Sequence, residues 1–293
     1  MFRFSVVFSL ICQILLPSAD VRGEDAPSKA FEVVTHANLA YREDKDADAD
    51  RHKLDLYIPK DQKDFPVLMF VHGGSWKSGN KSLYTPLGTL FAKSGIGVAV
   101  INYRLSGKNL TIKHPDHIND VAAAFAWVHA NIGKYGGKSD RLFISGHSAG
   151  GHLVSLLATD ASFLKKHKLG LDSIRGVMSL SGVYEIFPFP PFIEVFGRDV
   201  DICKAASPIN HVQAKDPPFL ICYADKDFPT IDTLSERFGK KLTDNKCEAK
   251  VLKIDNRTHI TIIVQIALSA DDLCTSAMLD FIAKHSEWKR AGK

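Results

Sequence analysis

One short segment near the middle of the chain restricts the fold more than any other. Residues 141–145 form a strand-length stretch, and the chain then reads Gly-His-Ser-Ala-Gly at residues 146–150 before a further apolar stretch. A strand that turns into a helix within so few residues brings backbone close to backbone, so the flanking positions require residues without a Cβ. The two glycines meet this requirement. The sequence therefore predicts a strand, a sharp turn and a helix, with the hydroxyl of Ser148 pushed outward at the turn.

The rest of the chain alternates between strand-like and helix-like segments. Residues 66–72 and 95–102 are continuous apolar runs, which are typical of parallel strands covered on both faces. Further strands are expected at residues 53–59, 141–145, 174–181, 218–224 and 249–254, and helices at residues 82–93, 116–132, 149–159, 230–245 and 270–285. This alternation predicts an α/β fold with a mostly parallel wound sheet and helices on both faces.

Residues 182–212 break the alternation because they are rich in proline and include the sequence Phe-Pro-Phe-Pro-Pro-Phe. We expect them to form a short cap-like insertion after the sixth strand, without regular elements, that folds over the top or edge of the sheet. The insertion is either a lid or acyl-pocket wall, or plain surface packing. No internal repeat or low-complexity linker interrupts the chain, so residues 24–293 are expected to form a single domain.

The first residues differ from the rest. A basic residue at position 3 precedes an apolar run at residues 4–16, and small residues follow it. This pattern predicts a signal peptide over residues 1–23, cleaved between Asp20 and Asp25, and hence a secreted or periplasmic protein. The apolar run is too short to span a bilayer, although an uncleaved membrane anchor is the alternative. After cleavage we expect no stable membrane insertion.

Composition excludes other classes of partner and cofactor. The chain has 293 residues and a formal net charge of +4, and it lacks the Lys/Arg blocks of a nucleic-acid-binding protein. Four cysteines remain after removal of the predicted signal peptide, at positions 203, 222, 247 and 274, and they match no metal-ligand spacing. Cys222 lies in an apolar strand and is interpreted as a buried hydrophobe, while one disulfide among the other three stays open. No metal and no cofactor are expected.

The environment expected around Ser148 points to nucleophilic chemistry. A serine hydroxyl attacks well only when an imidazole takes its proton, and a carboxylate must orient that imidazole. The strand at residues 218–224 is followed by Asp225 and Asp227, and the next strand is followed by His259. The alternative is that His259 is an ordinary surface histidine. However, the order serine, acid, histidine along this chain is the order found in wound α/β hydrolases.

Negative charge on a substrate oxygen also needs hydrogen-bond donors. The N–H of Ala149 is unpaired because it opens the predicted helix. A second set is expected from the turn after the strand at residues 66–72, where Gly73 and Gly74 let the backbone bend so that its N–H groups face inward. These three residues are the predicted oxyanion hole.

Several motifs together resemble the α/β-hydrolase superfamily, in the branch of hormone-sensitive-lipase-like esterases, feruloyl-esterase-like (BD-FAE) enzymes and kynurenine formamidase. They are His-Gly-Gly-Ser-Trp at residues 72–76, Asn-Tyr-Arg-Leu at 102–105, Gly-His-Ser-Ala-Gly-Gly-His-Leu at 146–153, Asp227 and His259. The resemblance runs from about residue 53 to residue 282. It implies Ser148 as nucleophile and His259 as base.

The resemblance also bears on the acid, which in the family follows its strand as Gly-x-x-Asp. Asp227 occupies that position, but Ala224 stands where the family has glycine, so Asp225 remains an alternative. The implied function is a secreted serine carboxylesterase that acts on a small-molecule or polysaccharide-linked ester, with short acyl groups. The alternatives are an arylformamidase and a non-catalytic binding protein on a hydrolase scaffold. The sequence leaves the oligomeric state open.

Overall fold

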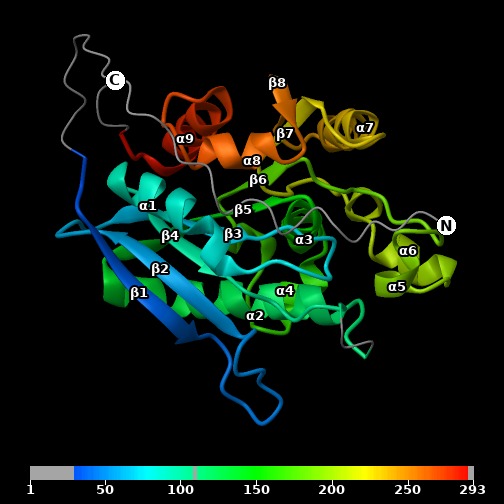
Figure 1. Ribbon diagram of the computed structural model, residues 1–293, viewed down its shortest axis with the longest axis horizontal. Helices are drawn as coiled ribbons and strands as arrows, with labels where there is room; N and C mark the ends of the chain where they lie inside the picture. The colour runs from blue at the N-terminus through cyan, green and yellow to red at the C-terminus, as the bar shows by residue number, and fades with distance from the viewer. Residues whose placement is uncertain (1–29, 108–110, 290–293) are drawn as a thin grey trace, which may run out of the picture.

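The apolar runs of the sequence become the central strands of one eight-stranded sheet. The computed structural model describes residues 30–107 and 111–289 (Figure 1), so the predicted signal peptide at residues 1–23 lies outside the described residues. The strands are β1 (Val33–Ala40), β2 (Lys53–Pro59), β3 (Phe65–Val71), β4 (Gly97–Ile101), β5 (Gly137–His147), β6 (Gly176–Leu180), β7 (Phe219–Lys226) and β8 (Ala249–Thr258).

The strand order in the sheet is β1-β2-β4-β3-β5-β6-β7-β8. β1 pairs with β2 and β2 with β4 in antiparallel fashion, and every other pairing is parallel. The carboxyl ends of β3, β5, β6, β7 and β8 therefore meet at one edge of the sheet. Residues that follow these strands lie close together there although they are far apart in the sequence.

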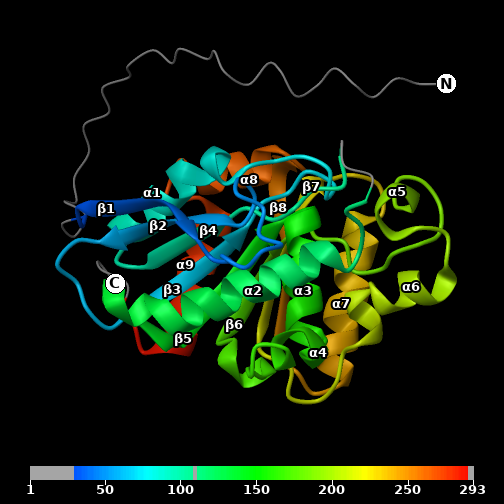
Figure 2. The ribbon, with the colours of Figure 1, turned by 90° about the horizontal axis from the view of Figure 1, so that it is seen from below.

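Helices cover both faces of the sheet (Figures 1 and 2). One face packs against α2 (Asp116–Asn131), α3 (Ala149–Thr159), α4 (Ala161–Lys165) and α7 (Ile231–Asp244), and the other against α1 (Thr85–Lys93), α8 (Thr261–Ile266) and α9 (Leu273–Ser286). The predicted α/β class and two-sided covering are confirmed. Within the described residues, no helix is long and apolar enough to cross a membrane.

The insertion after β6 contains more regular structure than its prolines suggested. It holds α5 (Ile193–Phe196), α6 (Val200–Ala205) and a 3₁₀ turn at Pro208–Asn210. The expectation of no regular element there was wrong, because the prolines cluster before α5 and leave the following residues free to form short helices. Phe196 packs on Trp76, with ring centroids 5.0 Å apart, so the insertion is anchored to the loop that follows β3.

The four cysteines of the described chain are buried free thiols, so the disulfide left open among Cys203, Cys247 and Cys274 is not formed here. The core needs no such link. Both faces of the central strands are buried against helices, and a chain of this length buries most of its unfolded surface in doing so.

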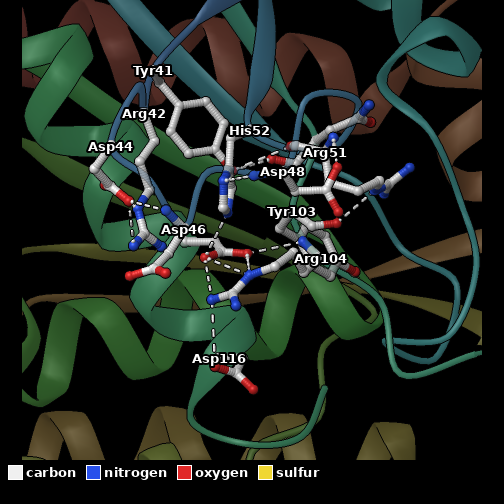
Figure 3. Close-up of polar contacts among 12 residues, drawn as sticks. Tyr41, Arg42, Asp44, Asp46, Asp48, Arg51, His52, Tyr103, Arg104 and Asp116 are labelled. Atoms are coloured by element: carbon white, nitrogen blue, oxygen red, sulfur yellow. Dashed lines mark hydrogen bonds and ion pairs between the residues drawn. The ribbon is translucent and has the colours of Figure 1, made fainter. Parts of the chain in front are cut away.

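A buried charged network ties the β1–β2 connection to α2 (Figure 3). Asp120 of α2 is 1% exposed and receives two hydrogen bonds from the Arg104 side chain, of 2.8 and 2.9 Å, and one from its backbone N–H. His52 accepts the N–H of Asp48 at Nδ1, so its Nε2 carries hydrogen and lies 3.0 Å from Asp120 Oδ1. Burial alone would raise the pKa of Asp120, but hydrogen bonds from His52 and Arg104 outweigh it and lower that pKa.

Substituting Asp120 with asparagine should lower the free energy of unfolding by on the order of 3 kcal/mol at neutral pH, because Arg104 and His52 lose a buried charged partner. The folded-state pKa of Asp120 lies below the ordinary 3.8. Its stabilisation is therefore present above that pH and is lost as the pH falls through the folded value. Urea unfolding from pH 7 to pH 3 should show the wild type approaching Asp120→Asn at low pH. An unchanging gap would contradict the assignment, and the exposed Asp44→Asn is the control.

The same connection reaches the loop after β3 through Arg51. Its guanidinium donates to the carbonyls of Tyr103 (2.8 Å) and Gly79 (3.2 Å) and lies 3.1 Å from His72 Nε2. Burial lowers the pKa of His72 to about 3, so the ring is neutral. Its Nδ1 donates to the Gly73 carbonyl at 2.7 Å, which leaves Nε2 to accept from Arg51. Arg51 thus fixes the start of the loop that carries Gly73.

Candidate active site

Ser148 sits at the turn between β5 and α3 in a conformation that few non-glycine residues adopt. Its φ is 56° and its ψ is −118°, and its N–H donates to the Leu180 carbonyl at 2.9 Å. A Cβ on Gly146 would lie 2.4 Å from the Gly150 backbone, and one on Gly150 would lie 2.1 Å from the carbonyl oxygen of Val71. The close backbone approach expected from the glycine pattern is present. Ser148 itself remains partly exposed.

Substituting Gly150 with alanine should reduce the free energy of unfolding by about 1–3 kcal/mol, because the added methyl overlaps a backbone oxygen of β3 that has no room to move. Chemical denaturation of the purified variant measures the change. Gly133→Ala is the matched control, since a Cβ there meets no atom within 4 Å. Equal stability of the two variants would show that the turn tolerates a side chain.

Asp227 and His259 are brought together at the ends of β7 and β8. His259 Nδ1 lies 2.5 Å from Asp227 Oδ1, and both side chains are buried. The carboxylate also accepts the hydroxyl of Ser181 at 2.5 Å and the N–H of Phe228 at 2.8 Å. Burial would raise the pKa of Asp227, but the hydrogen bonds from His259 and Ser181 lower it overall. Asp227 is therefore held as a carboxylate against the imidazole.

Asp225, the alternative acid, has a different environment. It is exposed and accepts the backbone N–H of Arg257 at 2.8 Å, and this hydrogen bond lowers its pKa. The Nδ1 of His259 is bound by Asp227, whereas Asp225 links the end of β7 to that of β8. In this geometry Asp227 is the carboxylate that orients the histidine.

His147 places His259 beside the serine turn. Burial lowers the pKa of His147 to about 3, so its ring is neutral, and its Nε2 donates to the His259 carbonyl at 2.8 Å. The two rings lie 4.7 Å apart. On another side, the Phe228 ring stacks on His259 at 4.1 Å while remaining 59% exposed. His259 is thus held from three directions, next to the residue that precedes Ser148.

The loop after β3 packs directly against Ser148. A Cβ on Gly73 would lie 3.2 Å from the Cβ of Ser148. The backbone then follows positive φ values at Gly74 (115°), Ser75 (53°) and Trp76 (59°), so the loop bends as its glycines predicted. The N–H of Gly73, however, donates to the Tyr84 hydroxyl at 3.3 Å. Gly74 and Ala149, the other predicted donors, directly follow Gly73 and Ser148 in the chain, whereas the Gly73 N–H already has a partner.

Sequence reasoning did not find Ser181, Tyr84, His147 or Phe228 as members of this site. Ser181 had a detectable signal, because a polar residue directly after a buried parallel strand lies at the edge where the site forms. Tyr84 had none, since it precedes α1 and its contact with Gly73 arises only in the folded chain. Trp76 is 4% exposed and donates to His152 Nδ1, so it packs beneath the loop.

Comparisons with known proteins agree with the resemblance seen in the sequence. Residues 54–189 match the BD-FAE family model. A solved structure described as a truncated carbohydrate esterase from gut microbiota superposes with a TM-score of 0.75 at 23% identity, covering 90% of this chain and all of that one. These matches agree with the order of features in the structure. A serine turn follows β5, an acid follows β7 and a histidine follows β8. The chain has the α/β-hydrolase fold.

Other proteins that match this chain are also esterases by name. Esterase B of Lactobacillus rhamnosis superposes with a TM-score of 0.73 at 21% identity, covering 90% and 89% of the two chains. Esterase LipC of Mycobacterium tuberculosis is 34% identical over 59% of the hydrolase and 48% of LipC. Isoprenylcysteine alpha-carbonyl methylesterase ICME of Arabidopsis thaliana is 27% identical over 74% and 56% of the two chains. The hydrolase thus spans about half the length of the curated relatives it matches.

The site offers no metal-binding set. Among residues 30–107 and 111–289, no group of three or more His, Cys, Asp or Glu side chains is placed to hold a metal ion. The polar groups near Ser148 are instead those of acyl transfer: a hydroxyl, a histidine–carboxylate pair and backbone N–H groups.

Proposed function

We propose that the hydrolase is a serine carboxylesterase that works through an acyl-enzyme on Ser148. The observation that carries this proposal is the 2.5 Å contact between Asp227 and His259, held beside a serine at a strained turn. Because Asp227 binds Nδ1, the Nε2 of His259 is the nitrogen left to take the serine proton. The esterase names of the matched relatives support ester bonds as the target.

The proposed reaction has two halves. Ser148 Oγ attacks the ester carbonyl carbon and passes its proton to His259, which then gives that proton to the departing alcohol. Water repeats the sequence on the acyl-enzyme and releases the acid. In each half, negative charge develops on the carbonyl oxygen, beside the N–H groups of Ala149 and the loop at Gly73 and Gly74. Asp227 stays ionised and stabilises the imidazolium.

We further propose that the substrate carries a short acyl group, as a small ester or attached to a polysaccharide, and that the protein is exported. The insertion between β6 and β7 contributes only two short helices and a 3₁₀ turn, which favours a small acyl pocket. The exposed ring of Phe228 gives a flat apolar surface beside His259 for the alcohol part. Export rests on the signal-peptide pattern of residues 1–23.

The test compares para-nitrophenyl acetate, butyrate and octanoate with N-formylkynurenine, using the hydrolase and its Ser148→Ala variant. We expect ester turnover that falls with acyl length and disappears in the variant. Preference for the formamide would assign the protein as an arylformamidase. No turnover of either class, together with no labelling by a serine-reactive phosphonate, would indicate a binding protein on a hydrolase scaffold.

A further inference from the structure

Tyr84 lies at the loop that carries the predicted oxyanion donors, and the reaction outlined above gives it no role. Its hydroxyl oxygen accepts the N–H of Gly73 at 3.3 Å. An N–H group has one hydrogen to give, so Gly73 cannot bind a substrate oxygen while this bond is kept. A phenol that accepts one hydrogen bond still has its own O–H to donate. In the described part of the chain, no acceptor is hydrogen-bonded to that O–H.

The position of Tyr84 is fixed by its surroundings. Its ring packs against Phe70 of β3, with centroids 4.8 Å apart. The preceding 3₁₀ turn, Lys81–Tyr84, is anchored because Lys81 Nζ lies 2.6 Å from the buried carboxylate of Asp55. A buried ion pair at one end of a four-residue turn therefore holds the phenol at the other end. Such fixed geometry is what a hydrogen-bond donor to a transition state needs.

Tyr84 and the nucleophile both contact Gly73. Gly73 separates Tyr84 from the nucleophile, because its N–H contacts the Tyr84 hydroxyl and its α-carbon faces Ser148, where an added Cβ would meet the serine Cβ at 3.2 Å. Tyr84 as a whole residue is partly buried. Burial of the phenol raises its pKa, which keeps the hydroxyl protonated at neutral pH.

We infer that the Tyr84 hydroxyl is a side-chain donor of the oxyanion hole, and that the Gly73 N–H acts through it rather than directly. As Ser148 Oγ bonds to the carbonyl carbon, the carbonyl π electrons move to oxygen, and the Tyr84 O–H hydrogen-bonds that oxygen without transferring its proton. By donating to the phenol oxygen, the Gly73 N–H polarises the Tyr84 O–H bond. The remaining direct donors are the N–H groups of Gly74 and Ala149. This inference rests on the proposed esterase function.

The first experiment compares Tyr84→Phe with the wild type on para-nitrophenyl butyrate. We expect kcat to fall about 100-fold, with KM within about twofold of the wild type, because the lost bond forms only as charge develops. Affinity for a trifluoromethyl ketone of matching chain length, which forms an anionic adduct on serine, should fall by a similar factor. The control is Tyr57→Phe, because the Tyr57 hydroxyl bonds Thr85 Oγ1 at 2.9 Å, next to Tyr84 but away from Gly73.

A second experiment separates donation from simple support of the loop. Tyr84 is replaced by a ring-fluorinated tyrosine whose phenol ionises within the assay range. An ionised phenolate still accepts the Gly73 N–H but cannot donate, so kcat should acquire a new loss as pH rises through the phenol pKa. A purely supporting Tyr84 would give no such loss.

Three outcomes distinguish the claims. Unchanged kcat in Tyr84→Phe, or a loss confined to KM with inhibitor affinity retained, overturns the role of Tyr84 and leaves the esterase proposal standing. If thermal melting shows that Tyr84→Phe is not folded, the pH profile of the fluorinated variant decides the question. If the wild type and Ser148→Ala are equally inactive on every ester, the esterase proposal itself has failed.

Discussion

Replacing Ser148 with alanine should lower kcat for ester hydrolysis by about 10,000-fold or more, because no acyl-enzyme can form without the hydroxyl. The backbone at this position has a φ of 56° with serine in place, and alanine retains the Cβ that the turn accommodates. The variant should therefore fold, and its unfolding midpoint should stay close to that of the wild type. Burst kinetics with para-nitrophenyl acetate measure both turnover and the number of acylated sites.

The controls for Ser148→Ala use the same chemistry. A fluorophosphonate should label the wild type at one site per chain, identified by mass spectrometry of the peptide containing Ser148, and should not label the variant. Retention of more than a small percentage of wild-type kcat, after residual wild type is excluded, would assign the nucleophile to another residue.

Substituting Asp227 with asparagine should cost on the order of 10,000-fold in kcat. The amide cannot stabilise an imidazolium, and it can present an N–H to His259 Nδ1 and so select the wrong tautomer. The Asp227 carboxylate accepts from three partners besides His259, namely Ser181, Ala224 and Phe228, so the loop itself should persist. Kinetics across pH 5–9 measure the loss of kcat. The loss should persist at high pH, because an asparagine side chain cannot ionise to a carboxylate.

Asp225→Asn is the matched control for Asp227→Asn. Asp225 lies two residues from Asp227, is exposed, and accepts only backbone N–H groups, among them that of Arg257. The activity of the Asp225→Asn variant should therefore remain within about threefold of the wild type. Equal losses in the two variants would indicate a general effect on the β7–β8 loops. A larger loss in Asp225→Asn would reverse the assignment of the acid.

The sequence predicted the parts of the fold whose signals are local. Apolar runs marked β3 and β4, and the spacing of Gly146 and Gly150 marked the turn at Ser148. β1 was missed because this edge strand is largely exposed and alternates irregularly, so it lacks the apolar run of a central strand. The short helices of the insertion were missed because proline composition describes a region on average, whereas helix formation depends on the few residues between prolines.

The same distinction holds for the candidate site. Chain order pointed to Ser148, Asp227 and His259, because parallel strands bring their carboxyl ends together. The sequence favoured Asp227 by its place in the Gly-x-x-Asp pattern but left Asp225 as an alternative, since both follow one strand and the choice depends on which carboxylate the loop turns inward. Ser181 and Tyr84 belong to segments whose distance from Ser148 is set only by packing. The redirection of the Gly73 N–H toward Tyr84 follows from one such contact.

The contacts of Arg51 define the smallest unit that can be active. The family-model match covers residues 54–189, which include Ser148, whereas Asp227 and His259 follow the matched segment. It omits the guanidinium that fastens His72, and with it the start of the loop at Gly73, to the β1–β2 connection. A fragment that starts at residue 54 and keeps the rest of the chain would retain the proposed nucleophile, base and acid but would lose the contacts of Arg51 with the predicted oxyanion loop. The proposed catalytic unit is therefore larger than the segment that the family model matches.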